Sequence, residues 1–185
     1  MKNIMAISAA ALLSFSASSL AANNFSVTST DMSSDKPLTQ QQVFNDFGCS
    51  GQNISPQLAW ANAPEGTKSF AVTVYDPDAP TGSGWWHWTL VNLPSTTTSL
   101  PAGAGDKQNP QLPSGAVQGR NDYGYAGFGG ACPPPGAKPH RYQFTVWALN
   151  TDKLPLDNQS SGAMVGYMLN NAALAKAEMT VKFGR

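Results

Sequence analysis

Charged side chains are scarce in this sequence. They make up 12% of its 185 residues, which is about half the share found in an average soluble domain. Basic and acidic residues number 11 each, so the formal net charge is zero. A protein that binds nucleic acid through a positively charged face is therefore not expected. The absence of blocks of like charge also excludes an electrostatic tail, while the content of large apolar residues is too high for a disordered chain.

Long apolar runs are missing as well. The apolar segment 4–13 is too short to span a bilayer of about 30 Å, and no later segment has about 18 consecutive apolar residues, so no transmembrane segment is expected. The segment follows the positive charge of Lys2 and precedes a Ser- and Ala-rich stretch that ends in Ser19-Leu20-Ala21. This layout predicts a secretory signal peptide over residues 1–21 and a periplasmic or secreted mature domain over 22–185. The alternative is a buried N-terminal helix.

The sequence has only two cysteines and two histidines. In an oxidising compartment, Cys49 and Cys132 are expected to form a disulfide; the alternative is two unrelated buried thiols. Neither His87 nor His140 belongs to a metal-ligand spacing such as His-x-x-x-His, so no metal and no other cofactor is expected.

Two catalytic motifs are also absent. No Gly-x-Ser-x-Gly elbow of an α/β-hydrolase occurs. The Gly-rich run at 123–130 lacks dinucleotide-binding spacing and leads into prolines. A Ser-His-Asp triad stays open, because its members need not be close in sequence.

The hydrophobic pattern predicts one mainly β domain. Alternating or continuous apolar residues predict strands at 25–29, 69–75, 86–92, 140–149 and 179–183. The strand at 69–75 is apolar on both faces and is expected to be central. A period near 3.6 predicts one helix at 161–176, capped by Asn158 or Ser160. We therefore expect a single-domain antiparallel β-sandwich-like fold with a short peripheral helix.

Three polar clusters stand at the ends of the predicted strands. Asp-Pro-Asp-Ala-Pro at 76–80 follows the central strand, and Trp-Trp-His-Trp at 85–88 opens the next one. Gly-Gly-Ala-Cys-Pro-Pro-Pro-Gly at 129–136 precedes His-Arg-Tyr at 140–142. Each cluster has a plain structural reading: a solvated turn, a core histidine that shares a face with Thr89 and Val91, and a surface loop.

Together the clusters suggest one pocket. If the strands are neighbours, Asp76, His87 and His140 converge at one edge of the sheet. An aspartate bonded to an imidazole keeps that imidazole a hydrogen-bond donor. Two imidazole N–H groups, the Tyr142 hydroxyl and backbone N–H groups at 130–132 would then hold a phosphate or carboxylate, while prolines form walls.

These residues, Asp-Pro-Asp-Ala-Pro, Trp-His-Trp, Cys-Pro-Pro-Pro-Gly and His-Arg-Tyr, together resemble the phosphatidylethanolamine-binding protein family, also called the Raf kinase inhibitor protein-like family. Two further motifs, Asn-x-Ser-Pro-x-Leu-x-Trp at 53–60 and Gly-Arg-Asn-Asp-x-Gly-Tyr-x-Gly at 119–127, are similar to its bacterial YbhB/YbcL-type branch, and the cysteine pair to its exported form. The resemblance covers nearly the whole mature chain.

The resemblance implies a β-sandwich-like fold with a small anion-binding pocket. The implied pocket and edge residues are Asp76, Asp78, Pro80, Trp85, His87, Pro133, Pro134, His140 and Tyr142. Cys132 stands where animal members have a glycine, so a bond to Cys49 would pin the rim. The long C-terminal helix of animal members is expected to be missing, which leaves the pocket more open.

The expected function is binding or regulation rather than catalysis. The ligand would be a small anion, and the resemblance implies modulation of a protein partner such as a kinase or protease; kinase inhibition is not expected in a periplasm. One alternative is a hydrolase with His87 or His140 as general base. Another is a protein inhibitor that acts through its rim loops and not through the pocket. The sequence leaves the oligomeric state open.

Overall fold

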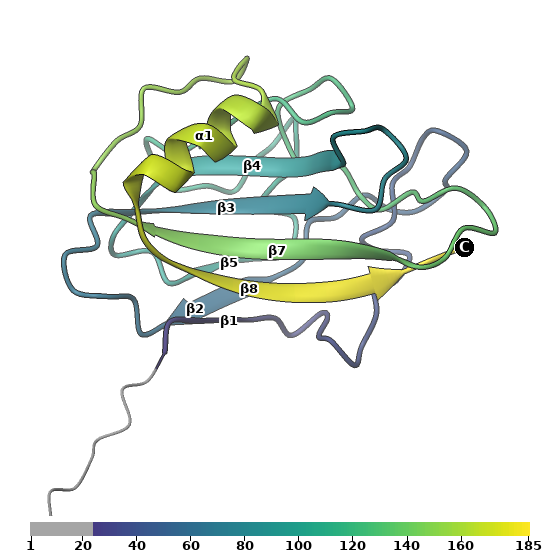
Figure 1. The fold of residues 1–185 in the computed structure, drawn as a ribbon, viewed down its shortest axis with the longest axis horizontal. Helices are drawn as coiled ribbons and strands as arrows, with labels where there is room; N and C mark the ends of the chain where they lie inside the picture. The colour runs from purple at the N-terminus through teal and green to yellow at the C-terminus, as the bar shows by residue number, and fades with distance from the viewer. Residues whose placement is uncertain (1–23) are drawn as a thin grey trace, which may run out of the picture.

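Two antiparallel β-sheets and one short helix make up residues 24–185, the part of the chain that this computed structural model describes (Figure 1). The elements are β1 (Ser26–Thr28), β2 (Leu58–Ala61), β3 (Ser69–Asp76), β4 (Trp85–Pro94), β5 (Ser99–Leu100), β6 (Val117–Gln118), β7 (His140–Leu149), α1 (Gly162–Ala172) and β8 (Ala173–Phe183). The predicted fold class is confirmed. The predicted signal peptide, residues 1–21, lies outside the described residues.

The larger sheet has the strand order β6-β4-β3-β7-β8, which places β3 at its centre as predicted. Every residue of β3 except Tyr75 is buried. Val72 and Val74 lie in the main hydrophobic core, while Ala71 packs on the opposite face with residues of α1. A strand covered on both faces needs apolar side chains at consecutive positions, which explains the continuous apolar run of its sequence.

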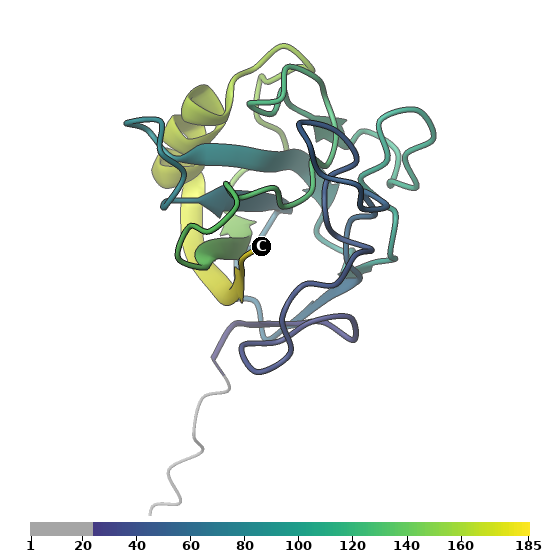
Figure 2. The ribbon, with the colours of Figure 1, turned by 90° about the vertical axis from the view of Figure 1, so that its right-hand side faces the viewer.

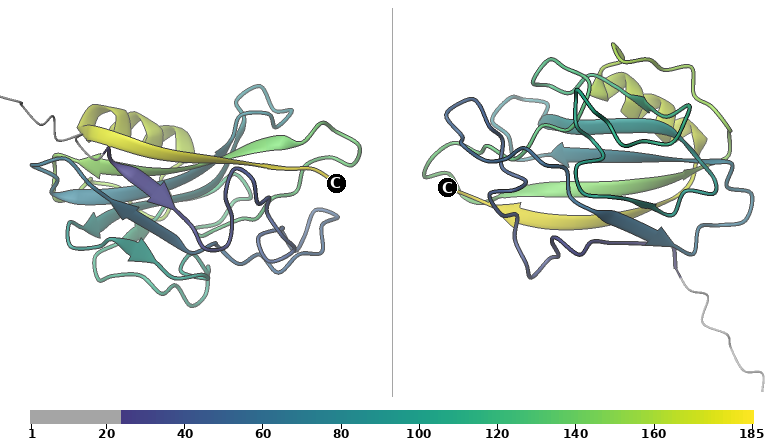
Figure 3. Two further views of the ribbon diagram at one scale, coloured as in Figure 1. Left: turned by 90° about the horizontal axis from the view of Figure 1, so that it is seen from below. Right: turned by 180° about the vertical axis from the view of Figure 1, so that it is seen from behind.

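The two faces of the larger sheet are covered differently. The helix α1 lies across one face, and the second sheet, in the order β1-β2-β5, lies with the long loops on the other face (Figures 2 and 3). Trp60 and Leu100 of the second sheet complete the main core. Among residues 24–185, no helix has the length and apolar character needed to cross a membrane.

The C-terminal segment differs from the prediction. The helix ends at Ala172 rather than at residue 176, and its N-cap is Ser161, whose hydroxyl accepts a hydrogen bond from the Met164 N–H. The chain then enters β8 at once, whereas the closing strand was expected only from residue 179. The segment 173–178 is rich in helix-favouring residues, but it pairs with β7 along nearly its whole length. Tertiary pairing therefore overrides the local preference.

Candidate functional site

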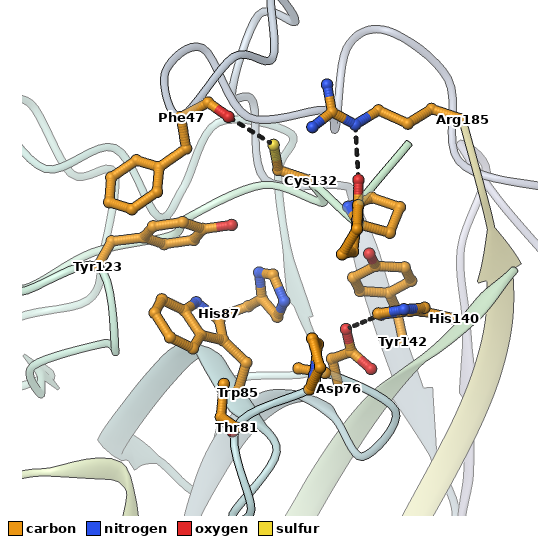
Figure 4. A pocket seen from close by; sticks show the side chains of 14 residues that line it. Phe47, Asp76, Thr81, Trp85, His87, Tyr123, Cys132, His140, Tyr142 and Arg185 are labelled. Carbon is orange, nitrogen blue, oxygen red and sulfur yellow. Dashed lines mark hydrogen bonds and ion pairs between the residues drawn. The ribbon is translucent and has the colours of Figure 1, made fainter. Parts of the chain in front are cut away.

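The end of β3 lies beside the beginnings of β4 and β7 at one edge of the larger sheet (Figure 1). These segments surround a cavity of about 340 Å³ (Figure 4). We call it the main cavity. Its lining residues are Phe47, Asp76, Ala79, Pro80, Thr81, Trp85, His87, Tyr123, Cys132, Pro133, Pro134, His140, Tyr142 and Arg185. Because antiparallel neighbours bring the end of one strand beside the start of the next, residues far apart in the sequence meet here.

A buried acid and imidazole form one wall of the main cavity. The Nδ1 atom of His140 lies 2.7 Å from Oδ2 of Asp76, and the two side chains are only 7% and 4% exposed. The carboxylate accepts this hydrogen bond, so Nδ1 carries the proton. The other carboxylate oxygen accepts the Asp78 N–H at 2.8 Å. This turn bond and the rigid Pro77 between the two residues hold the carboxylate in place.

His87 reaches the main cavity because β4 contains a β-bulge. Val74 of β3 pairs with Trp88 and Tyr75 pairs with Trp86, which leaves His87 without an opposite residue. In a regular strand, His87 would share the helix-side face with Thr89 and Val91, as the sequence predicted. Instead, its ring lies 5.2 Å from that of Tyr142, a residue of the main core. The predicted face of His87 is therefore wrong, and the bulge re-aims its side chain.

The loop after β6 holds this bulge. The Gly129 N–H donates to the His87 carbonyl at 2.8 Å, and the Asp122 carboxylate accepts the Trp86 N–H at 2.7 Å. On the far side of the same loop, Asn53 accepts the Gly130 N–H at 2.7 Å. A Cβ on Gly130 would lie 2.4 Å from the Gln42 carbonyl oxygen, so the loop passes where no larger residue fits.

The His87 ring is fixed in a defined tautomer. Its Nδ1 lies 2.7 Å from the Gly129 carbonyl oxygen, which can only accept, so Nδ1 donates and Nε2 remains as an acceptor when the ring is neutral. Burial, which disfavours the charged imidazolium, lowers the pKa of His87 below its ordinary value of 6.5, against the opposing effects of the Gly129 carbonyl and Asp76. At neutral pH the main cavity therefore contains a neutral imidazole beside the Asp76 and His140 pair.

Two tyrosines supply hydroxyl groups of different status. The Tyr123 hydroxyl donates to the Gly130 carbonyl at 3.0 Å. The Tyr142 hydroxyl is buried and has no hydrogen-bond partner among residues 24–185. Burial, together with the nearby Asp76 charge, raises the pKa of both phenols, so both stay protonated. An unsatisfied buried hydroxyl costs free energy.

A proline wall and a disulfide close the opposite side. Cys49 and Cys132 are bonded, with their Cα atoms 6.0 Å apart, which confirms the predicted disulfide. The bond joins the wall at Pro133 to the loop that carries Phe47, an aromatic side chain 64% exposed at the cavity mouth. Arg185 donates to the Pro133 carbonyl at 2.6 Å (Figure 4). It also donates to the Gly48 carbonyl at 2.7 Å and so links the same two segments.

Known proteins share this architecture. The family model described as phosphatidylethanolamine-binding protein matches residues 28–184. The chain belongs to the phosphatidylethanolamine-binding protein family. Among its relatives, the UPF0098 protein YbcL of Escherichia coli K12 is 61% identical over 180 residues, which cover 97% of each chain. The UPF0098 protein YbhB of the same organism is 50% identical over 155 residues, which cover 84% of this chain and 97% of YbhB.

Solved structures agree with this assignment. The crystal structure of E. coli YbcL, described as a member of the mammalian PEBP family, matches with a TM-score of 0.86 and 63% identity and covers 87% of this chain and 98% of the other. A putative phosphatidylethanolamine-binding protein homologue from Chlamydia trachomatis matches with a TM-score of 0.73 and 28% identity, over 88% and 99% of the two chains.

In this chain, all predicted site residues except Asp78 line the main cavity. Asp78 lies just outside and forms a two-pronged ion pair with Arg141, with Nη2 to Oδ1 at 2.7 Å and Nε to Oδ2 at 2.9 Å. The Arg141 hydrogen bonds lower the pKa of Asp78 to about 2. The prediction that backbone N–H groups near residue 130 face a ligand is wrong for Gly130 and Ala131, whose N–H groups donate to Asn53 and Gln42.

Sequence reasoning missed five lining residues: Phe47, Ala79, Thr81, Tyr123 and Arg185. Tyr123 lies within the motif at 119–127 that the sequence did single out, and its place in that motif was a usable signal. Phe47 sits in a left-handed backbone conformation, with φ of 54°, which no local pattern indicates. Arg185 arrives only through the path of β8, so nothing near it in the sequence predicts its place.

The lowered pKa of His87 predicts how stability depends on pH. Below pH 6.5 the unfolded chain binds a proton at this histidine before the folded chain does, so the free energy of unfolding falls as the pH falls. The contribution of one such group is at most about 1.4 kcal/mol per pH unit. His87→Asn keeps an N–H donor for Gly129 but cannot titrate. Urea unfolding between pH 7 and pH 5 is expected to show a shallower slope for the variant; equal slopes would contradict the prediction.

Proposed function

We propose that this protein is an exported binding protein whose main cavity takes the phosphate or carboxylate group of a small ligand. The observation that carries the proposal is the unpartnered Tyr142 hydroxyl, buried next to the paired Asp76 and His140. A neutral phenol is a strong donor to an anionic oxygen, and hydrogen bonds to charged groups contribute about 1.5–3 kcal/mol each. Asp76 binds His140 and the Asp78 N–H, and neither bond uses the Tyr142 hydroxyl.

The charges around the main cavity also favour an anion. Both nearby acids already have partners, since Asp76 binds His140 and Asp78 binds Arg141. The guanidinium of Arg185 adds a positive charge beside the proline wall. A ligand with a negative group would therefore meet donors rather than free carboxylates. The neutral His87 would accept a hydrogen bond from a protonated phosphate oxygen at Nε2.

Weak binding of orthophosphate tests the proposal. Millimolar phosphate is expected to raise the melting temperature and to shift the imidazole NMR signals of His87 and His140. Tyr142→Phe removes only the unpartnered hydroxyl, so we expect it to fold normally and to weaken phosphate binding about tenfold. Tyr167→Phe on the exposed face of α1 is the matched control and should leave affinity unchanged. No response to millimolar phosphate, or equal affinity in Tyr142→Phe, would refute an anion pocket built on this wall.

Export is part of the same proposal. The layout of residues 1–21 and the disulfide support it, because disulfides persist mainly in oxidising compartments. A relative that is 32% identical over 137 residues is named putative lipoprotein LppC of Mycobacterium tuberculosis. Cell fractionation should place the mature protein in the periplasm, or in the medium, with Ala22 as its first residue by mass spectrometry. An uncleaved cytoplasmic product would refute this part.

Two further functions have one supporting observation each. The oriented, neutral imidazole of His87 would suit a general base, as in a small hydrolase. Turnover of phosphoesters or esters that disappears in His87→Asn would favour this function. The exposed Phe47 at the cavity mouth supports instead a protein inhibitor that acts through its rim loops. Binding of a partner such as a protease or a kinase that survives His140→Ala would favour that function.

A further inference from the structure

A second hollow lies beside the main cavity. It has a volume of about 690 Å³. Its lining residues are Asp78, Pro80, Pro134, Ala137, Lys138, Pro139, His140, Arg141 and Lys182. Pro80, Pro134 and His140 line both spaces. We call the second hollow the basic groove. The two spaces therefore share a wall made of two rigid prolines and one imidazole.

The basic groove concentrates positive charge in a protein that has little charge. Lys138, Arg141 and Lys182 line it, and Asp78 is its single acid. Arg141 and Lys182 lie directly opposite each other on β7 and β8. Like charges at such cross-strand positions repel, and the ion pair of Arg141 with Asp78 offsets only part of that repulsion.

The single acid of the groove is already used. Asp78 accepts two side-chain hydrogen bonds from Arg141 and also the Arg141 backbone N–H at 2.8 Å. Within residues 24–185, no salt bridge involves Lys138 or Lys182. Two exposed ammonium groups are thus left without a counter-charge, next to a cavity whose own acid is also paired.

We propose that the basic groove is a second anion subsite, so that the ligand carries two anionic groups, one in the main cavity and one at Lys138 and Lys182. The inference rests on the proposed function, since it extends the same site. Because a single imidazole and two prolines separate the spaces, the two groups are joined by a short linker. The ligand class is a compact bisphosphate or a phosphorylated carboxylic acid. An anion in the groove also relieves the repulsion between Arg141 and Lys182.

Calorimetric titration of the exported protein tests the second subsite. Pyrophosphate and propanediol bisphosphate are compared with orthophosphate and propyl phosphate. At least one bisphosphate is expected to bind about tenfold more tightly than its single-phosphate partner. The Lys138→Ala/Lys182→Ala double variant should lose this gain and keep its affinity for the single phosphates. Lys153→Ala, which removes an exposed lysine that lines neither space, is the control and should keep the gain.

The outcomes separate the two proposals. If single phosphates bind but bisphosphates bind no more tightly, the second subsite is refuted and the main cavity stands. If the gain persists in the double variant, it comes from ligand charge alone and the subsite is refuted. If no phosphate compound binds at all, the proposed function itself fails. The subsite is supported if the tighter binding of the bisphosphate is lost in the Lys138→Ala/Lys182→Ala variant but not in Lys153→Ala, with circular dichroism unchanged.

Discussion

Replacing both cysteines with serine, Cys49→Ser/Cys132→Ser, is expected to lower the free energy of unfolding by about 3–5 kcal/mol. The bonded residues are 83 positions apart. Cross-linking a loop of this length restricts the unfolded chain, and the chain-entropy model gives an upper value of about 4–5 kcal/mol for that restriction. Equilibrium urea unfolding of the parent and the variant at neutral pH measures the difference directly.

The native geometry around the bond has other supports. The Phe44 N–H donates to the Ala131 carbonyl at 3.0 Å, and the Ala131 N–H donates to Gln42 at 3.0 Å. These bonds hold the two bridged segments side by side without the sulfur atoms. We therefore expect the double variant to fold and to bind phosphate with an affinity within a few-fold of the parent, although it is less stable.

Both single variants serve as controls for the disulfide. Cys49→Ser and Cys132→Ser should each lower the free energy of unfolding by nearly as much as the double variant does, because either change removes the bond. Thiol labelling should find no free thiol in the native protein. A loss below about 1 kcal/mol in the double variant, or a labelled cysteine in the parent, would contradict a stabilising bond.

Asp76→Ala is expected to destabilise the protein by about 3–5 kcal/mol, because it leaves the buried His140 ring without its partner. The two side chains are almost fully buried, so water cannot replace the lost hydrogen bond. The change also removes the acceptor of the Asp78 N–H. Phosphate binding should be lost in the same variant, since Asp76 no longer holds the His140 ring in place at the main cavity.

The adjacent acid provides a matched comparison. Asp78→Ala also breaks an ion pair with a residue of β7, but the side chains of Arg141 and Asp78 are 49% and 30% exposed. Exposed pairs contribute about 0–1 kcal/mol, so this variant should lose little stability. A double-mutant cycle of Asp76→Ala with His140→Ala measures the coupling free energy between these two residues. If both aspartate variants lose equal stability, or if the cycle gives no coupling between Asp76 and His140, the prediction that the buried pair stabilises the protein more than the exposed pair is wrong.

Much of the site could be predicted because strong strand patterns end at the polar clusters. The runs before Asp76 and after His140 are long, apolar and β-branched, so β3 and β7 stand out in the sequence. Because β3 and β7 are adjacent antiparallel strands, the end of β3 at Asp76 lies beside the beginning of β7 at His140. The bond between Cys49 and Cys132 likewise needed only an even cysteine count and an oxidising compartment.

Other features of the site have no local signal. The Trp-rich opening of β4 reads as a regular strand, and a regular strand would point His87 toward α1. The bulge exists because Trp86 and the residues after it are held by Asp122 and Gly129, which come much later in the chain. The end of α1 shows the same limit, since the segment 173–178 favours a helix until β7 offers it a pairing edge.

By itself, the sequence determined the mainly β class, the central strand and the polar residues that stand at the strand ends, because apolar periodicity and proline-rich turns act over a few neighbouring positions. Only the tertiary structure decided which of those polar groups face one another, that His87 turns into the main cavity, and that Arg185 and the basic groove border it. Those features depend on hydrogen bonds and charges between distant segments, and such contacts exist only after the chain has folded.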